Sequence, residues 1–451
     1  MAIFFFGRIT DRLIALLLTM SVFAISQDKP VSDQELFEMS LQDIMNVQVL
    51  SVSHFDTPLI KTPGYTMVIK QDKIGSGPAR TLHDILNMYI PGNIVGYHGF
   101  HGSLHGVRGI LIDNNAKTTV HLEDHNLNQR THFGYTVGML SPLLGDIDRI
   151  EITNGPGSIT QGSGAINGFI NMIAKTGSKH PGLLCSGEYG TKEAGYRLQA
   201  GYGHQFGLDK DLFLYAGIYN ADGYTPQNLL GQIPAYPVKS YGFGETGYRL
   251  SATWNHKALH FNAFVFENNP NKGSAMTGKS NLQGYFHNLT AGFQSKYSLR
   301  FNSTDRLDIL GSLAWFDFYE NEKGRGWEND TLKLAGGSEQ HTEFQAILKT
   351  TRFSHHNLAL GALAGSKFFN PEQLYFGSDD LETLEILDTE WQEFSVFLED
   401  RWQMAQSLTL TSGLRLDKVK THPFYGDALP RPMSRAIDSH ISPQVTIWQV
   451  S

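Results

Sequence analysis

The sequence predicts a mostly β protein, in which an N-terminal mixed α/β domain is followed by antiparallel transmembrane β-barrel strands. The first observation is composition: the 451 residues include 46 glycines and 12% aromatic residues, but only 18% are charged, whereas soluble domains are about 25% charged. The second is a series of strand-like segments of roughly ten residues from residue 181 onward, with alternating apolar and polar positions. The third is a strict alternation of short and long links between these segments.

Composition also excludes several classes of protein. No run approaches the ~18 consecutive apolar residues of a membrane-spanning helix, and the chain is too aromatic and too weakly charged to be disordered. The single cysteine, Cys185, rules out a disulfide framework and a cysteine-based zinc site, and we interpret it as a small strand residue. A net charge of −8 argues against nucleic acid as a partner.

Residues 1–26 predict a signal peptide for export. Arg8 and Arg12 precede the apolar stretch 13–25, and polar residues follow it from Gln27 onward. This stretch suits the apolar region of a signal peptide and is too short to span a bilayer. A buried N-terminal helix is the alternative interpretation.

The remaining chain divides near residue 180. We expect an N-terminal extension at residues 27–55, a mixed domain at 56–180 and barrel strands at 181–451. Within the mixed domain, Leu82, Ile85 and Leu86 recur at helical spacing in the segment 79–88, and Pro91-Gly92 ends the helix.

The alternation is clear in the segments 392–402 and 408–417. In the first, the apolar face carries Phe394, Val396, Leu398 and Trp402, and the polar face carries Glu393, Ser395, Glu399 and Arg401, with Phe397 and Asp400 as exceptions. Such strands lie either between lipid and a wet lumen or between a core and solvent. Periodicity alone leaves both a membrane barrel and a soluble sandwich open.

The links between strands favour the barrel. Tight links fall near residues 205–210, 256–258, 302–305, 354–356 and 404–407, and long polar links near 221–247, 268–284, 320–337, 368–388 and 418–440. Outer-membrane barrels have short periplasmic turns and long outer loops. A sandwich has no physical reason to keep its long loops at one end of every hairpin.

Residues 148–175, DRIEITNGPGSITQGSGAINGFINMIAK, carry a glycine-rich motif between two strand-like segments. The glycines permit a tight turn and a close approach of backbones, but no helix and no Lys-Ser/Thr pair follows them, so they do not form a phosphate cradle. The run resembles the plug domain of TonB-dependent outer-membrane receptors, and the segments 68–70, 82–86, 91–92 and 107–110 follow the family's order. The positions that carry the resemblance are Arg108, Gly109, Arg149, Glu151, Gly155, Pro156, Gly157, Gly162, Ala165, Asn167 and Gly168.

Three residues depart from the family pattern. Asn154 stands where the family usually has a basic residue, Gln161 stands where it usually has an aromatic residue, and His125 replaces a glycine. These changes leave the expected fold intact.

The resemblance implies energy-coupled uptake of a large scarce nutrient, such as a siderophore, cobalamin or a similar chelate, in the cell outer membrane. The inner-membrane protein TonB then pairs with an extended segment before the plug by strand addition. The candidate segment is Val47, Gln48, Val49, Leu50, Ser51, Val52 and Ser53; the alternative is an ordinary first plug strand. The implied partners are TonB, outer-membrane lipid and a small chelate, and no cofactor, resident metal or catalytic residue is expected.

The resemblance places candidate ligand-binding residues at two plug apices, within residues 93–104 and 127–140. They are Tyr97, His98, Phe100, His101, Gln129, Arg130, His132, Phe133 and Tyr135. Aromatic rings and a cation suit a flat or anionic chelate. His98, His101 and His105 have a spacing that suggests a haem or metal ligand, but histidines are common in loops and the motif of haem receptors is missing. The acidic stretch 379–390 suggests either a calcium site or, with better support, a solvated loop.

Two other functions remain as alternatives: a passive porin-like channel, and a surface enzyme of the outer membrane.

The number of strand segments and the last residues of the sequence lead to a further expectation about the barrel. We count about twelve strand segments where the family has about 22, and twelve strands enclose a pore too narrow for a plug. The final residues 448–451 also lack the terminal aromatic residue of the family. The sequence therefore predicts an incomplete barrel, about half of the expected strands, in the N-terminal part of a longer receptor.

Overall fold

The structure is a computed structural model, and its strands fall into one large sheet and a smaller N-terminal domain. It describes residues 48–49, 53–59, 62, 65–76, 79–98, 102–107, 109–110, 117–129, 134–135, 137–155, 157, 160, 162, 164–191, 195–222, 245–273, 283–323, 336–373, 389–405, 408–421 and 440–450.

The N-terminal domain is built on a five-stranded sheet of order β3-β8-β9-β6-β7. Its strands are β3 (Tyr65–Lys70), β6 (Thr118–Leu122), β7 (His125–Asn126), β8 (Ile147–Asn154) and β9 (Gly168–Ala174). β6 and β9 are parallel, and the other neighbours are antiparallel. Every described side chain of β6 and β9 is buried, which agrees with their position inside the sheet.

Two helices accompany this sheet, α4 (Gln71–Ser76) and α5 (Leu82–Tyr89). Thr81 caps α5: its Oγ1 accepts a hydrogen bond from Asp84 N at 3.1 Å, and Asp84 Oδ2 accepts one from Thr81 N at 3.0 Å. This reciprocal pair is a capping box. It explains why the helix begins at Leu82, whereas the sequence predicted a start at residue 79. The short helix α4 was not predicted.

Two small antiparallel pairs and one 3₁₀ turn complete the domain. β1 (Gln48–Val49) pairs with β2 (Thr57–Pro58), and β4 (Asn93–His98) pairs with β5 (Gly102–Val107). The 3₁₀ turn η3 covers Val137–Leu140.

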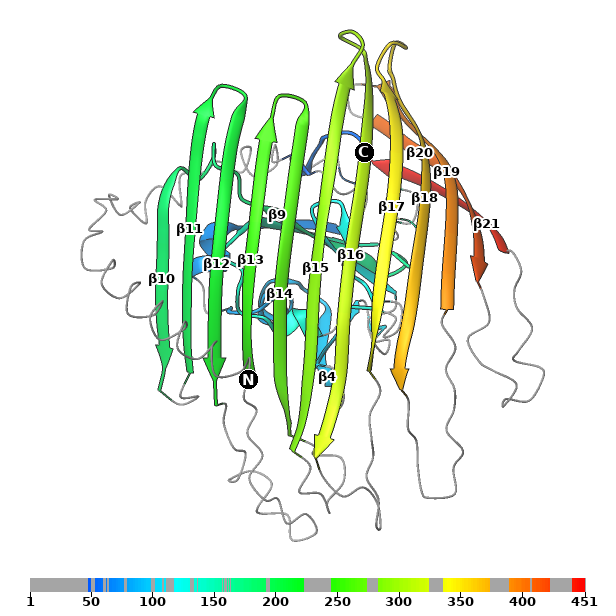
Figure 1. Cartoon of the computed structure of the whole chain (residues 1–451). Helices are drawn as coiled ribbons and strands as arrows, with labels where there is room; N and C mark the ends of the chain where they lie inside the picture. Colours follow the sequence, from blue (N-terminus) through cyan, green and yellow to red (C-terminus); the bar gives the residue numbers. More distant parts are fainter. Residues whose placement is uncertain are drawn as a thin grey trace, which may run out of the picture. The chain divides into compact units, whose positions relative to one another are not determined.

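The large sheet has twelve strands, each antiparallel to the next in chain order (Figure 1). They are β10 (Gly182–Gly190), β11 (Gly195–Gly207), β12 (Lys210–Ala221), β13 (Glu245–His256), β14 (Leu259–Gly273), β15 (Gln283–Arg300), β16 (Asp305–Lys323), β17 (Gly336–Thr350), β18 (His356–Gln373), β19 (Thr389–Ala405), β20 (Leu408–Thr421) and β21 (His440–Val450). The predicted short links all join neighbouring strands at one end of the sheet. The predicted long links fall largely on residues outside those described.

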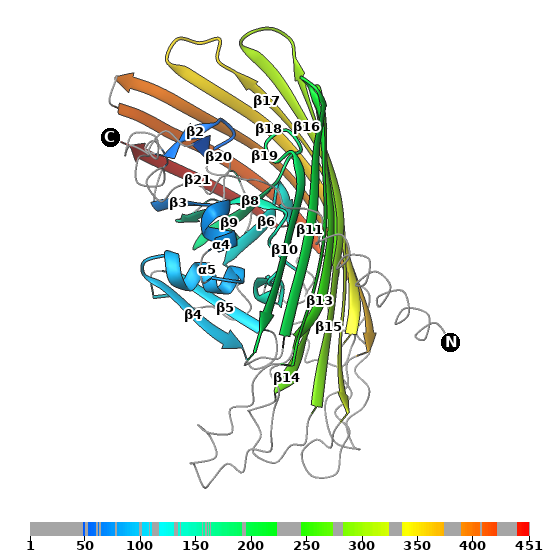
Figure 2. The same cartoon turned by 90° about the vertical axis from the view of Figure 1, so that its left-hand side faces the viewer.

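The twelve strands form an open, curved wall, and the N-terminal domain lies on its concave side (Figure 2). Among the described strands, β10 and β21 each pair with one neighbour only, so the barrel is not closed. Phe264 and Phe266 of β14 belong to the same buried cluster as Leu86 and Ile150 of the N-terminal domain. This shared core fixes the domain against the wall, because burial of apolar area is the main favourable contribution to packing.

Strand β19 confirms the predicted alternation. Phe394, Val396 and Leu398 are 39–54% exposed on the convex side. On the opposite face, Phe397 is buried because its ring stacks on the ring of His54, at a centroid distance of 4.7 Å. Asp400, the other exception to the alternation, lies 2.9 Å from Nδ1 of His356 across the strand pair. Both exceptions therefore have tertiary or cross-strand partners.

None of the helices that the structure describes has the length and apolar character needed to cross a membrane.

Candidate functional site: the interface between the N-terminal domain and the wall

The glycine-rich motif joins β8 to β9 and sets their close packing. A Cβ on Gly168 would lie 2.2 Å from the carbonyl oxygen of Thr153, so only glycine fits there. Gly162 has a φ of +77°, and a Cβ there would lie 3.1 Å from Arg415 Nη2 on β20. Gly155 N donates to Asn167 O at 3.0 Å and Gly157 N to Ala165 O at 2.9 Å. The motif is thus a compact backbone-bonded turn against the wall.

The charged residues of the motif form an ion pair with each other inside the domain. Glu151 is fully buried in β8, and Arg149 Nη2 lies 2.9 Å from its carboxylate. A buried carboxylate needs such a partner, because burial alone disfavours its charge. Gly109 lies in a turn with a φ of +82°. Arg108 and Pro156 lie outside the described residues.

The candidate coupling segment lies at the short-link end of the wall. Of residues 47–53, the structure describes Gln48, Val49 and Ser53, and Val49 is fully buried where β1 pairs with β2. Ser53 Oγ donates to Glu399 of β19, and His54 N donates to the same carboxylate at 3.1 Å. The remaining four residues, Val47, Leu50, Ser51 and Val52, lie outside the described residues.

The first predicted apex corresponds to the β4–β5 hairpin. This hairpin points toward the end of the wall where β14 ends and β15 begins (Figure 2). Tyr97 and His98 are the last residues of β4, whereas Phe100 and His101 lie outside the described residues. His105 is buried in β5, and burial, with a smaller effect of His83, lowers the pKa of its imidazole to about 4. Among the described residues, no group of three His, Cys, Asp or Glu side chains is arranged to hold a metal ion.

The second predicted apex is turned partly into the interface. Gln129 is buried, and its Nε2 donates to Asn288 Oδ1 of β15 at 3.0 Å. Tyr135 is also buried, which raises the pKa of its hydroxyl to about 12. Arg130, His132 and Phe133 lie outside the described residues. The ligand-binding role of both apices remains a prediction.

One buried ion pair, which sequence reasoning missed, joins the domain to the wall. Asp146 Oδ2 accepts hydrogen bonds from Arg249 Nε of β13 at 2.8 Å and from Ser251 Oγ at 2.7 Å. Asp146 and Arg249 are 1% and 3% exposed. The Arg249 guanidinium also lies over the ring of Phe266, 5.4 Å from its centroid. No sequence signal marks this pair, because its members are 103 positions apart.

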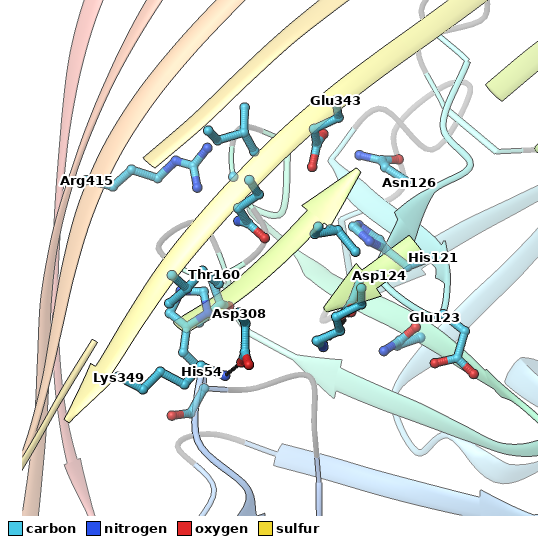
Figure 3. A pocket seen from close by; sticks show the side chains of 18 of the residues that line it. His54, His121, Glu123, Asp124, Asn126, Thr160, Asp308, Glu343, Lys349 and Arg415 are labelled. Atoms are coloured by element: carbon cyan, nitrogen blue, oxygen red, sulfur yellow. Dashed lines mark hydrogen bonds and ion pairs between the residues drawn. The ribbon is translucent and has the colours of Figure 1, made fainter. Parts of the chain in front are cut away.

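A polar cavity of about 170 Å³ lies between the domain and the wall (Figure 3). Its lining carries charges of both signs. Lys296 Nζ lies 2.8 Å from Asp124 Oδ2, and Lys349 Nζ lies 2.8 Å from Asp308 Oδ2. Burial alone would raise the pKa of Asp124, but the Lys296 ammonium outweighs it and holds that pKa at about 2. The cavity is suited to water and ions rather than to an apolar ligand.

Comparisons with known proteins agree with this geometry. Residues 58–169 match the family model described as the TonB-dependent receptor plug domain. The chain is 28% identical over 170 residues to the vitamin B12 transporter BtuB of Vibrio vulnificus (strain CMCP6). This match covers 37% of this chain and 27% of that relative.

Solved structures show the same fold. The pyoverdine outer membrane receptor FpvA from Pseudomonas aeruginosa PAO1, bound to pyoverdine, superposes with a TM-score of 0.65 at 12% identity, covering 88% of this chain and 62% of that chain. BauA, the ferric preacinetobactin receptor from Acinetobacter baumannii, superposes with a TM-score of 0.63 at 12% identity, covering 89% and 62%. The chain thus spans less than two thirds of the length of each of these relatives. They are named as a transporter and as receptors, not as enzymes.

Proposed function

We propose that this chain, whose plug domain and barrel strands are similar to those of TonB-dependent receptors of the cell outer membrane, serves the energy-coupled uptake of a large, scarce nutrient. The proposal rests on the position of the plug, which lies on the concave side of the wall. The Asp146–Arg249 ion pair and the shared core with β14 hold it there. A passive channel needs an open lumen, whereas a folded domain occupies the concave side of this wall.

The proposed cargo is a metal chelate such as a siderophore or cobalamin. The names of the relatives support this class: one transports vitamin B12, and others bind pyoverdine or ferric preacinetobactin. The β4–β5 hairpin and the segment 127–140 would offer aromatic rings and a cation to such a ligand. Flat or anionic chelates are bound well by this combination of side chains.

The proposed energy source is TonB, which would pair with residues 47–53. The structure supports strand addition there, because Gln48–Val49 already forms a two-residue ladder with Thr57–Pro58. A partner strand would exchange this short ladder for a longer one through main-chain hydrogen bonds. No enzymatic activity is proposed for the chain.

Uptake in the native strain tests the proposal. Cells are offered radiolabelled cobalamin and ferric siderophores in turn, with and without collapse of the proton gradient. Loss of uptake on collapse supports energy coupling, whereas uptake that survives it supports the porin-like channel.

A proline substitution tests the coupling segment. Val49→Pro removes a strand donor and fixes φ, so we expect ligand binding to the cells to persist and uptake to fall at least about tenfold. Val31→Pro, the same change outside the segment, is the matched control and should take up ligand normally. Normal uptake by Val49→Pro would show that residues 47–53 are not the coupling strand. A serine-hydrolase probe that labels the purified chain would instead favour the surface-enzyme alternative.

A further inference from the structure

The β6–β7 hairpin of the plug carries two histidines into the interface with the wall. His121 is the last residue but one of β6 and His125 is the first residue of β7, and they are 6% and 3% exposed. The turn between β6 and β7 consists of Glu123 and Asp124. Glu123 has a positive φ of 57°, which is uncommon for a residue other than glycine. His125 also stands where the family pattern has a glycine.

The two imidazole rings are buried, and three of their four nitrogens lack a hydrogen-bond partner in the part of the chain that the structure describes. Both ring nitrogens of His125, and Nε2 of His121, have none among the described residues. The ring of His125 instead packs edge-on against Phe264 of β14, at a centroid distance of 5.6 Å. Unpaired buried polar atoms are rare in native proteins because they cost free energy, so they call for an explanation.

The charges that face His125 come mainly from cations and from another histidine. His341 of β17 and Lys367 of β18 are direct cross-strand partners, and each disfavours a proton on His125, as does His121. The carboxylate nearest to His341 is Glu339, which is already paired with it. A proton on His125 would therefore add a positive charge beside others in a buried space.

The carboxylates around His121 have partners of their own. Burial disfavours a proton on His121, whereas the neighbouring Asp124 carboxylate favours one. Asp124 is paired with Lys296 of β15, and Glu123 accepts a hydrogen bond from Ala174 N at 2.7 Å and faces His260 of β14 at 3.9 Å. The cavity that His121 lines also contains Glu343 and Glu393, together with Lys367 and Arg415 (Figure 3). Because this cavity is polar and has room for water, protons can reach the ring of His121.

We propose that the β6–β7 hairpin is a proton-sensitive attachment of the plug to the barrel wall, which is tight at neutral pH and loosens when the medium turns acidic. Protonated imidazoles beside Lys367 and His341 would be repelled from the wall and drawn toward water. The proposal concerns the hairpin alone and does not depend on which nutrient is taken up.

The direction of the pKa shifts agrees with this geometry. Burial lowers the pKa of His125 to about 3 and that of His121 to about 4, from an ordinary value of 6.5. The released hairpin would therefore bind protons that the seated hairpin does not, between pH 6.5 and about 3 at His125 and between pH 6.5 and about 4 at His121. By linkage, the stability of the seated state is fully present above pH 6.5 and falls as the pH falls through this window.

Amide hydrogen exchange between pH 4.5 and 7.5 tests the proposal. The sample is the native protein extracted from outer membranes in detergent, not the refolded 451-residue chain. After correction for the intrinsic pH dependence, exchange in residues 118–126 should rise at least about tenfold toward pH 4.5, while β8 and β9 remain protected. The double variant His121→Asn, His125→Phe should keep slow exchange in the hairpin at both ends of the range. His83→Asn, which removes a buried plug histidine on α5, is the control and should behave like the unchanged chain.

A second variant keeps the test decisive if the double variant does not fold. Lys367→Met leaves both histidines in place and removes the facing cation. The pKa of the seated His125 should then move toward its ordinary value, so the rise in exchange toward low pH should be smaller. The proposal would be overturned if the exchange rate of residues 118–126 in the unchanged chain did not depend on pH. It would also be overturned if the double variant showed the same rise in exchange rate toward low pH. Simultaneous loss of protection in β8 and β9 would also overturn it, because the event would then be unfolding of the whole plug.

Discussion

Two ion pairs of the interface, which differ in burial, show how single residues hold the plug. Asp146 and Arg249 are almost completely buried, and each has one buried polar atom, Oδ1 and Nη2, without a partner among the described residues. Asp124 and Lys296 make an equally short contact, but their side chains are 43% and 34% exposed. Water and salt screen the second pair, so the two contacts should differ in strength despite equal distances.

A double-mutant cycle tests this difference. Arg249→Met leaves the Asp146 carboxylate buried without its cation, which should destabilise the plug by about 3–5 kcal/mol. Adding Asp146→Leu should restore part of that loss, because no buried charge then remains. Lys296→Met, the exposed counterpart, should cost less than about 1 kcal/mol. Urea unfolding followed by exchange protection of β8 and β9 measures each value, and strict additivity of the two buried-site changes would contradict the argument.

At the scale of elements, local sequence patterns predicted the strands. They did not predict the contacts between segments that are far apart in the sequence. The alternation in β19 and the five short links follow from neighbouring residues, so the sequence sufficed for them. The burial of Phe397 and the bond from Ser53 to Glu399 join positions about 345 apart, and no periodicity marks them. Helix α5 illustrates an intermediate case: its apolar spacing was predicted, but its start was set by the Thr81 cap.

The two faces of β19 should react differently with labelling reagents. With Cys185 changed to serine, single cysteines at Phe394, Val396 and Leu398 should react with a lipid-soluble maleimide in native outer membranes and resist a charged one. These side chains are exposed on the convex side of the wall, which lipid covers in a barrel. A cysteine at Ser395, on the plug-facing side, should resist both reagents until urea loosens the plug. The opposite pattern would mean that the wall faces water.

At the scale of the whole molecule, the wall and the plug differ in how they complete their hydrogen bonds. Within the plug, the edges of the five-stranded sheet are strands β3 and β7, and β3 is exposed at its first and last residues. In the wall, β10 and β21 are edge strands of a sheet whose convex face is apolar. Each unpaired backbone group costs several kcal/mol in hydrocarbon, so the edges of the wall are far less tolerable than those of the plug.

The open edges lead to a prediction about the 451-residue chain produced as it stands. Twelve strands closed on themselves would enclose a lumen about half as wide as that of 22 strands, because diameter grows roughly linearly with strand number. The plug occupies the concave side of the wall, so β10 and β21 cannot meet around it. We therefore expect no heat-modifiable barrel when this chain is refolded in detergent or lipid, as judged by its mobility in unheated gels. The pyoverdine receptor, refolded in parallel, is the positive control. Strands that pair with β10 and β21, supplied by further sequence or by a second polypeptide, should restore the mobility shift. A shift with the 451-residue chain alone would show that the wall closes without them, and that the plug then leaves the lumen.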